Sequence, residues 1–139
     1  MQLSNYLFFR TGCEQALAHY TRCGLGKVTV MVRHGDNGMP VHAEEMRGQI
    51  MHSCFEGPGV KFFASDNHDA EPMRGSAHMI VTDDRAQTDR LFKALAEGGR
   101  ITTPIGMQPW GDYYGKLTDR FGVQWMLNLP IASKATSGA

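Results

Sequence analysis

The sequence lacks the features that would tie it to a membrane or to a nucleic acid. No apolar run approaches the roughly 18 residues that a membrane span requires. The N-terminal "MQLSNYLFFR" has neither the basic start nor the small-residue cleavage site of a signal peptide. Lys plus Arg and Asp plus Glu both number 14, so the formal charge is zero, and no basic run is present. We therefore expect neither nucleic acid nor membrane as a partner.

Cysteine is scarce as well, with only Cys13, Cys23 and Cys54. An odd number of cysteines without the spacing of metal ligands is typical of reduced thiols, and it predicts a cytoplasmic protein. Cys13 and Cys23 are expected on one helix about three turns apart, which is too far for a disulfide. The sequence also lacks a Ser-His-Asp or Cys-His order and a glycine-rich phosphate loop between a strand and a helix.

What the sequence does contain is one pattern of elements that occurs twice. Residues 3–10 alternate like a strand, and "TGCEQALAHYTRCG" has apolar residues at the i, i+3, i+4, i+7 spacing of a helix that packs on a sheet. Thr11 and Glu14 have the spacing of a capping box for this helix. The remaining strands of this copy are expected at 27–33, 49–56 and 60–65. A loop at 34–47 is expected between the first and the second of these strands.

The second copy begins with the strand "AHMIVT" and the helix "DDRAQTDRLFKALAEGG", for which Asp83 or Asp84 is the expected N-cap. A short strand "RITTP" and a hairpin of "YYGKLTD" and "VQWMLNL" complete it. A doubled unit of about 60 residues indicates internal repetition. We predict an α+β fold of two tandem βαβββ modules that form a curved, cup-like mixed sheet with helices on its outer face. The expected domain spans 1–129, with modules at about 1–66 and 76–129, and a disordered tail at 130–139.

This pattern resembles the vicinal-oxygen-chelate superfamily, which includes glyoxalases, extradiol dioxygenases and bleomycin-resistance proteins. Within it, "NYLFFRTGCEQALAHYTRCGLG" and "WGDYYGKLTDRFGVQWMLN" are similar to PhnB-like proteins. The resemblance covers nearly all of residues 1–129 and is least specific in the middle, at 35–74. It implies a concave sheet that binds a small molecule, and a homodimer whose modules can be swapped between chains.

The resemblance also implies where a metal would be bound, on the first strand and near the end of the fourth strand of each module. Counting along the chain places these positions at Asn5, Phe63, His78 and Met126. A catalytic Zn²⁺ site uses about three N, O or S ligands, and other transition metals rely on imidazole and carboxylate donors. Because only His78 is a strong donor, we predict no family-type metal and a hydrogen-bonded cavity histidine at this position.

An alternative ligand set would use a divalent metal as cofactor. His52 and Glu56 share one face of their strand by period-two alternation, and together with His78 they would supply two imidazoles and a carboxylate. Such a metal would chelate two adjacent oxygens of a substrate and stabilise an enolate. This alternative predicts a metal-dependent lyase, isomerase or dioxygenase, whereas the first hypothesis predicts a binding protein for an unidentified small molecule.

The last hairpin carries most of the predicted cavity. If Met126 faces the cavity, alternation places Gln124 and Asn128 beside it and turns Trp125 toward the helix. The neighbouring strand contributes either the set Tyr114, Lys116 and Thr118 or the set Tyr113 and Asp119. The turn "WGD" offers Trp110 to close over a ligand and Asp112 as a candidate base, or it is a capped turn with a packed indole. The full set of predicted cavity residues is Asn5, His52, Phe63, His78, Trp110, Tyr114, Lys116, Gln124, Met126 and Asn128.

Overall fold

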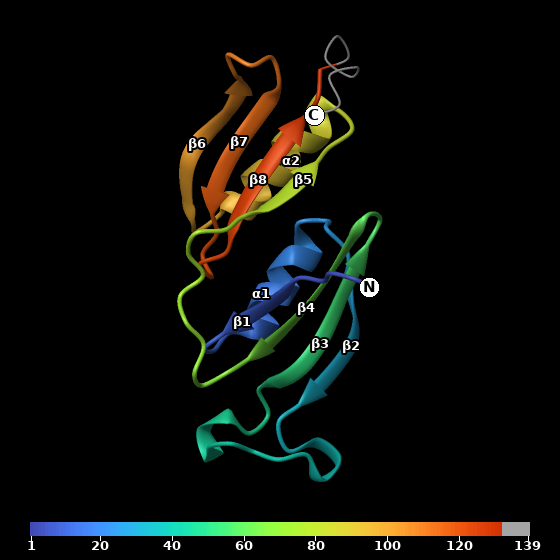
Figure 1. Cartoon of the computed structure of the whole chain (residues 1–139), viewed down its shortest axis with the longest axis vertical. Helices are drawn as coiled ribbons and strands as arrows, with labels where there is room; N and C mark the ends of the chain where they lie inside the picture. The colour runs from blue at the N-terminus through green and yellow to red at the C-terminus, as the bar shows by residue number, and fades with distance from the viewer. Residues whose placement is uncertain (132–139) are drawn as a thin grey trace. The chain divides into compact units, whose positions relative to one another are not determined.

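A computed structural model describes residues 1–131 of the chain, coloured from blue to red in Figure 1. The chain divides into two compact units, Met1–Pro72 and a second that begins at Met73. In the predicted tail, residues 132–139 lie outside the described part of the chain. Within that part, no helix has the length and apolar character that a membrane crossing requires.

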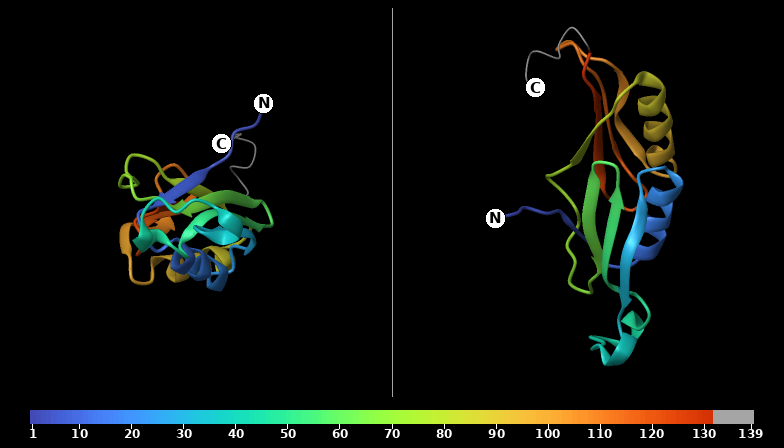
Figure 2. Two further views of the ribbon diagram at one scale, coloured as in Figure 1. Left: turned by 90° about the horizontal axis from the view of Figure 1, so that it is seen from below. Right: turned by 90° about the vertical axis from the view of Figure 1, so that its right-hand side faces the viewer.

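The first unit is a four-stranded mixed sheet with one α-helix. In the sheet order β1-β4-β3-β2, β1 pairs with β4 in parallel and the other neighbours are antiparallel. Helix α1 packs against one face of this sheet, as the right-hand view of Figure 2 shows. The elements of the first unit are β1 (Tyr6–Phe9), α1 (Cys13–Arg22), β2 (Lys27–Arg33), the short helices η1 (Asp36–Gly38) and η2 (Glu44–Met46), β3 (Ile50–Gly57) and β4 (Val60–Asp66).

The second unit repeats this arrangement. Its sheet order is β5-β8-β7-β6, again with one parallel pair, between β5 and β8. Helix α2 packs against β6, β7 and β8. The elements are β5 (His78–Val81), α2 (Arg85–Ala96), β6 (Arg100–Met107), β7 (Tyr113–Thr118) and β8 (Gln124–Leu129). The predicted α+β fold of two tandem βαβββ modules is therefore confirmed.

The two helices begin in different ways. Helix α2 has the predicted cap, because the Asp84 carboxylate accepts a hydrogen bond from the Gln87 N–H at 2.8 Å. The capping box predicted for α1 is wrong, since its N-cap is Gly12 and no side chain caps it locally. Instead the buried carboxylate of Asp66, at the end of β4, accepts from the Cys13 N–H at 3.0 Å and from the Ile50 N–H at 2.9 Å.

The core of each unit lies between its helix and its sheet. In the first unit the Tyr20 ring of α1 meets Phe55 and Phe62 edge-on, at centroid distances of 6.4 and 6.1 Å. In the second unit the buried side chains of α2 are Thr88, Leu91, Phe92 and Leu95. We call the sheet surface against the helix the helix face and the opposite surface the open face. Exposed apolar side chains, such as Phe8 at 49% and Met79 at 57%, lie on the open faces.

Candidate functional site

The strand registers decide which side chains occupy the open faces. In the first unit Tyr6 pairs with Phe63, while the next pair, Leu7 and Ala64, is buried toward α1. Because successive side chains of a strand alternate between the two faces, Tyr6 and Phe63 lie on the open face. In the second unit the corresponding pair is Met79 and Met126. Tyr6, Phe63, Met79 and Met126 therefore occupy the open-face positions of the first and fourth strands.

His78 lies on the other side of its sheet. It pairs with the buried Trp125, and its ring centroid is 5.4 Å from the indole. Burial lowers the pKa of His78, against an opposing effect of the Asp119 carboxylate. The structure thus places His78 on the helix face, opposite to the face predicted for it, and Met79 takes the place beside Met126. The physical reason is that an error of one residue in a strand register moves a side chain to the other face.

Asn5, the counterpart of His78 in the first unit, directly precedes β1 and is exposed. Its backbone carbonyl accepts a hydrogen bond from the Phe63 N–H at 2.9 Å, which starts the parallel pairing of β1 with β4. The role that the structure shows for Asn5 is therefore in the backbone ladder. Tyr6, the next residue, carries the side chain that pairs with Phe63 on the open face.

The residues at the implied metal positions do not fit a divalent ion. Phenylalanine has no donor atom, and methionine thioethers are soft ligands that suit Cu(I) better than Zn²⁺, Fe²⁺ or Mn²⁺. In the alternative ligand set, His52 Nδ1 is 2.9 Å from the Tyr6 hydroxyl, and Glu56 accepts from the Thr29 hydroxyl at 2.6 Å. Among residues 1–131, no group of three or more His, Cys, Asp or Glu side chains is placed to hold a metal.

The open face of the first unit is rich in aromatic rings. Tyr6 lies 4.9 Å from Phe8, 5.8 Å from His52 and 6.0 Å from Phe63 between ring centroids. His52 in turn lies 5.7 Å from Phe63, with an interplanar angle of 21°. The Lys61 ammonium is 5.8 Å from the centroid of the Phe63 ring. Two of the predicted cavity residues, His52 of β3 and Phe63 of β4, are therefore brought together here, beside Tyr6 of β1.

The open face of the second unit combines polar side chains with methionine. On β8, Trp125 and Leu127 are buried toward α2, whereas Gln124, Met126 and Asn128 lie half-buried on the open face. The register with β7 pairs these three with Thr118, Lys116 and Tyr114, respectively. The structure thus selects the first of the two sets that alternation left open.

The other set, Tyr113 and Asp119, points away from the open face. The Tyr113 hydroxyl donates to Asp89 on α2 at 2.5 Å, and this carboxylate raises the pKa of Tyr113. Asp119 is buried in the hairpin turn, where its carboxylate accepts from the Phe121 and Val123 N–H groups and from the Trp125 indole. Both residues therefore stabilise the second unit internally.

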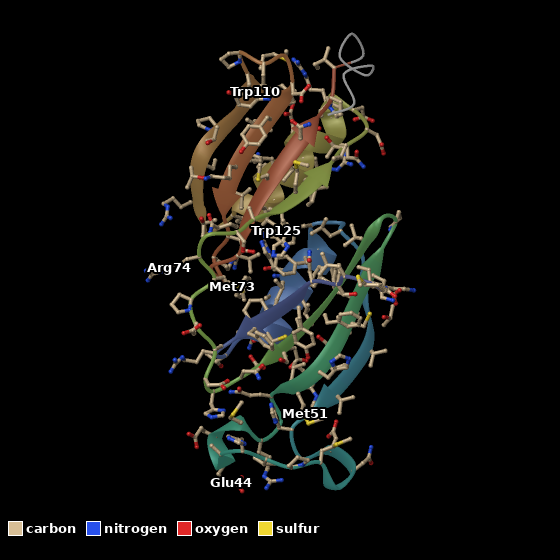
Figure 3. The ribbon with its side chains drawn as sticks, viewed as in Figure 1. Glu44, Met51, Met73, Arg74, Trp110 and Trp125 are labelled. Carbon is tan, nitrogen blue, oxygen red and sulfur yellow. The ribbon has the colours of Figure 1, made fainter. Side chains whose placement is uncertain are left out.

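The turn "WGD" stands at the end of this open face. Trp110 is 56% exposed, and its ring meets Tyr114 edge-on at 5.6 Å, so the indole is not packed in the core. The Asp112 carboxylate is buried and accepts from the Asn128 side-chain amide at 3.3 Å. In Figure 3 the labels of Trp110 and Trp125 stand at opposite ends of the second sheet. The turn therefore combines one exposed aromatic ring with a carboxylate that orients Asn128.

A family model described as 3-demethylubiquinone-9 3-methyltransferase matches residues 1–128. The chain belongs to this family. The crystal structure of PA1353 from Pseudomonas aeruginosa is similar to it, with a TM-score of 0.83, 36% identity, and coverage of 94% of this chain and 98% of that one. YjdN of Escherichia coli is 28% identical over 142 residues, covering 93% of this chain and 95% of YjdN.

The PhnB protein of Bacillus cereus has the same fold, with a TM-score of 0.76, 24% identity, and coverage of 93% of this chain and 99% of that one. The fold is also that of structures described as glyoxalase, bleomycin resistance or dioxygenase superfamily members. The predicted family is therefore confirmed by the family model, and the fold is that of this superfamily. In this member of the 3-demethylubiquinone-9 3-methyltransferase family, the open-face pairs are Tyr6 with Phe63 and Met79 with Met126.

Four residues of this family member's open faces were not among the predicted site residues: Tyr6, Phe8, Lys61 and Met79. Period-two alternation indicated that Phe8 shares a face with Tyr6. Alternation could not show that Tyr6 contacts His52, because their strands β1 and β3 are not adjacent and lie on either side of β4. Met79 was missed because the register of β5 against β8 is a tertiary property.

Proposed function

We propose that the protein binds a small organic molecule on the open faces of its sheets and does so without a catalytic metal. The observation that carries this proposal is that Tyr6, Phe63, Met79 and Met126 occupy the open-face positions of the first and fourth strands, the strands on which the resemblance implies the metal ligands. Aromatic rings and thioethers give dispersion and stacking contacts to organic groups, whereas they bind hard divalent ions poorly.

Polar side chains among these apolar contacts support the same proposal. Binding sites for small molecules combine a mainly apolar lining with a few polar groups that orient the ligand. On the second sheet, Lys116, Gln124 and Asn128 share the open face with Met126. The amide of Asn128 is held by the buried Asp112 carboxylate, so its carbonyl oxygen has a defined direction. We assign Asp112 to this orienting role.

Metal content is the first test. We expect protein purified without added metal and then dialysed to contain far less than one equivalent of Zn, Ni, Fe or Mn per chain by mass spectrometry of elements. His78→Ala is expected to leave that content unchanged, because the imidazole lies on the helix face. A stoichiometric ion that disappears in His78→Ala would contradict the proposal and restore the alternative of a metal-dependent enzyme.

Ligand binding can be followed through Trp110. We expect compounds released from the denatured protein, identified by mass spectrometry, to quench tryptophan emission when they are added back. The quenched emission should come from Trp110, which is exposed, and not from Trp125, which is buried with its indole N–H bonded to Asp119. In Trp110→Phe the remaining emission is therefore expected to be insensitive to the compound. Equal quenching in Trp110→Phe would show that the compound does not bind beside Trp110 on the open face of the second unit.

A further inference from the structure

The open face of the first unit carries a continuous group of rings from three neighbouring strands. Tyr6 and Phe8 come from β1, Phe63 from β4 and His52 from β3. The rings of Tyr6 and His52 are inclined to that of Phe63 by only 24° and 21°. Because Tyr6 is 38% exposed, π surface of this group remains accessible. A flat aromatic ligand gains more from such a group than a globular one, since stacking requires a planar partner.

One end of this ring group offers a directed hydrogen bond. The Tyr6 hydroxyl lies 2.9 Å from His52 Nδ1. If the Tyr6 hydroxyl donates to Nδ1, the neutral imidazole carries its own proton on Nε2. If Nδ1–H donates to the Tyr6 oxygen, the hydroxyl keeps its proton for another acceptor. Either arrangement leaves one donor that a ligand oxygen can accept from. Among the residues that the structure describes, Nε2 of His52 has no hydrogen-bond partner.

The other end of the group carries a positive charge. On β4, Lys61 precedes Phe63 by two residues. The residue after Phe63, Ala64, pairs with Ser53 of β3, and His52 is the next residue of β3 in that direction. Lys61 and His52 therefore flank Phe63 from opposite ends. The Lys61 ammonium makes no ion pair with residues 1–131. Its cross-strand neighbour Glu56 has its carboxylate hydrogen-bonded to Thr29, and this hydrogen bond, together with the charge of Lys61, lowers the pKa of Glu56.

We infer that this face binds a planar aromatic anion, with its ring against Phe63 and Tyr6. Its anionic group is directed toward Lys61, and an oxygen at its far end accepts a hydrogen bond from the Tyr6–His52 pair. This inference rests on the proposed function and deepens it by naming the ligand class. The three contacts select for planarity, for charge and for a polar atom at the end opposite the charge, so each can be tested separately.

The probes are four small molecules, the fourth of which is the neutral 2,6-dihydroxynaphthalene. 6-Hydroxynaphthalene-2-sulfonate is planar, anionic and fluorescent, and it carries an oxygen opposite its charge. Naphthalene-2-sulfonate lacks that oxygen, and adamantane-1-carboxylate is an anion without an aromatic ring. In fluorescence titrations we expect the hydroxyl probe to bind about fivefold more tightly than naphthalene-2-sulfonate. Adamantane-1-carboxylate is expected not to compete.

Variants of the three contacts should separate these properties. Phe63→Leu is expected to weaken both naphthalene probes about tenfold, because it removes the ring but keeps most of the apolar volume. Lys61→Gln should weaken the sulfonates about threefold and leave the neutral 2,6-dihydroxynaphthalene unaffected. Tyr6→Phe should remove only the advantage of the hydroxyl probe. Lys93→Gln, on α2, serves as the control and is expected to change nothing.

Several outcomes would overturn this inference. Equal affinity of wild type, Phe63→Leu and Tyr6→Phe, or competition by adamantane-1-carboxylate, would show that no stacked aromatic site exists. A change in light-scattering mass in place of a change in affinity would identify the face as an interface with a second copy. If the naphthalenes do not bind but a co-purified compound still quenches Trp110, the inference is wrong while the proposed function stands. The exposed variant Lys61→Gln keeps the test valid if Phe63→Leu does not fold.

Discussion

Replacing Asp119 by alanine is expected to lower the free energy of unfolding by about 3–5 kcal/mol, because a buried donor that loses its acceptor costs about 1–3 kcal/mol. One carboxylate oxygen accepts from the Phe121 N–H at 2.8 Å and from the Val123 N–H at 3.0 Å. The other accepts from the Trp125 indole at 2.9 Å. The single side chain therefore closes the β7–β8 turn and fixes the indole of the core.

Urea unfolding followed by tryptophan emission in a Trp110→Phe background, in which only Trp125 emits, measures this effect. Asp119→Asn is an informative second variant, since its one remaining oxygen can keep the two turn bonds while the amide replaces the acceptor of the indole N–H. We expect it to lose less stability than Asp119→Ala. The matched control is Asp69→Ala, an exposed carboxylate, for which a change within about 0.5 kcal/mol is expected. If Asp119→Ala were as mild as this control, the turn would not depend on the carboxylate.

Replacing Gly57 by alanine is expected to cost about 3 kcal/mol or more, because added volume in a packed region forces the backbone to move. A Cβ at this position would stand 2.0 Å from the Leu25 carbonyl oxygen and 2.9 Å from Gly26 Cα. Both neighbours are backbone atoms, which cannot rotate away as a flexible side chain can. The connection from α1 to β2 crosses the end of β3 here.

The control for this prediction is Gly59→Ala, two residues further on. Nothing lies within 4 Å of its Cβ position, but its φ of 70° is in the left-handed region. The expected cost there is about 1 kcal/mol, from backbone conformation alone. Thermal unfolding by circular dichroism compares the two variants. A smaller loss in Gly57→Ala than in Gly59→Ala would show that the two connections do not approach so closely.

The same close approach occurs in the second unit, which supports the internal repetition. A Cβ on Gly99 would stand 2.4 Å from the Thr118 carbonyl oxygen, again where the chain leaves the helix and passes the end of a strand. In both units a glycine lets the connection that follows the helix lie directly against the backbone at the end of a strand. The repeat seen in the sequence therefore extends to the packing of the connections.

The sequence by itself determined what depends on neighbouring residues in the chain. The i, i+3, i+4, i+7 spacing in "TGCEQALAHYTRCG" predicted that α1 packs one side on a sheet, and Asp84 was one of the two expected caps of α2. Alternation in "VQWMLNL" correctly separated Trp125 and Leu127 from Gln124, Met126 and Asn128. These features follow from the geometry of a single helix or strand, in which side-chain direction repeats with a fixed period.

Tertiary structure decided everything that depends on which residue lies opposite which. The cap of α1 comes from Asp66, more than 50 residues away in the sequence. His78 faces the helix, and Tyr114 rather than Tyr113 joins Asn128, because strand registers are set by the lengths of connections and by packing. Local periodicity shows which residues of a strand share a face, but not which part of the structure that face contacts. A shift of one residue exchanges the faces, and the composition of the candidate site changes with it.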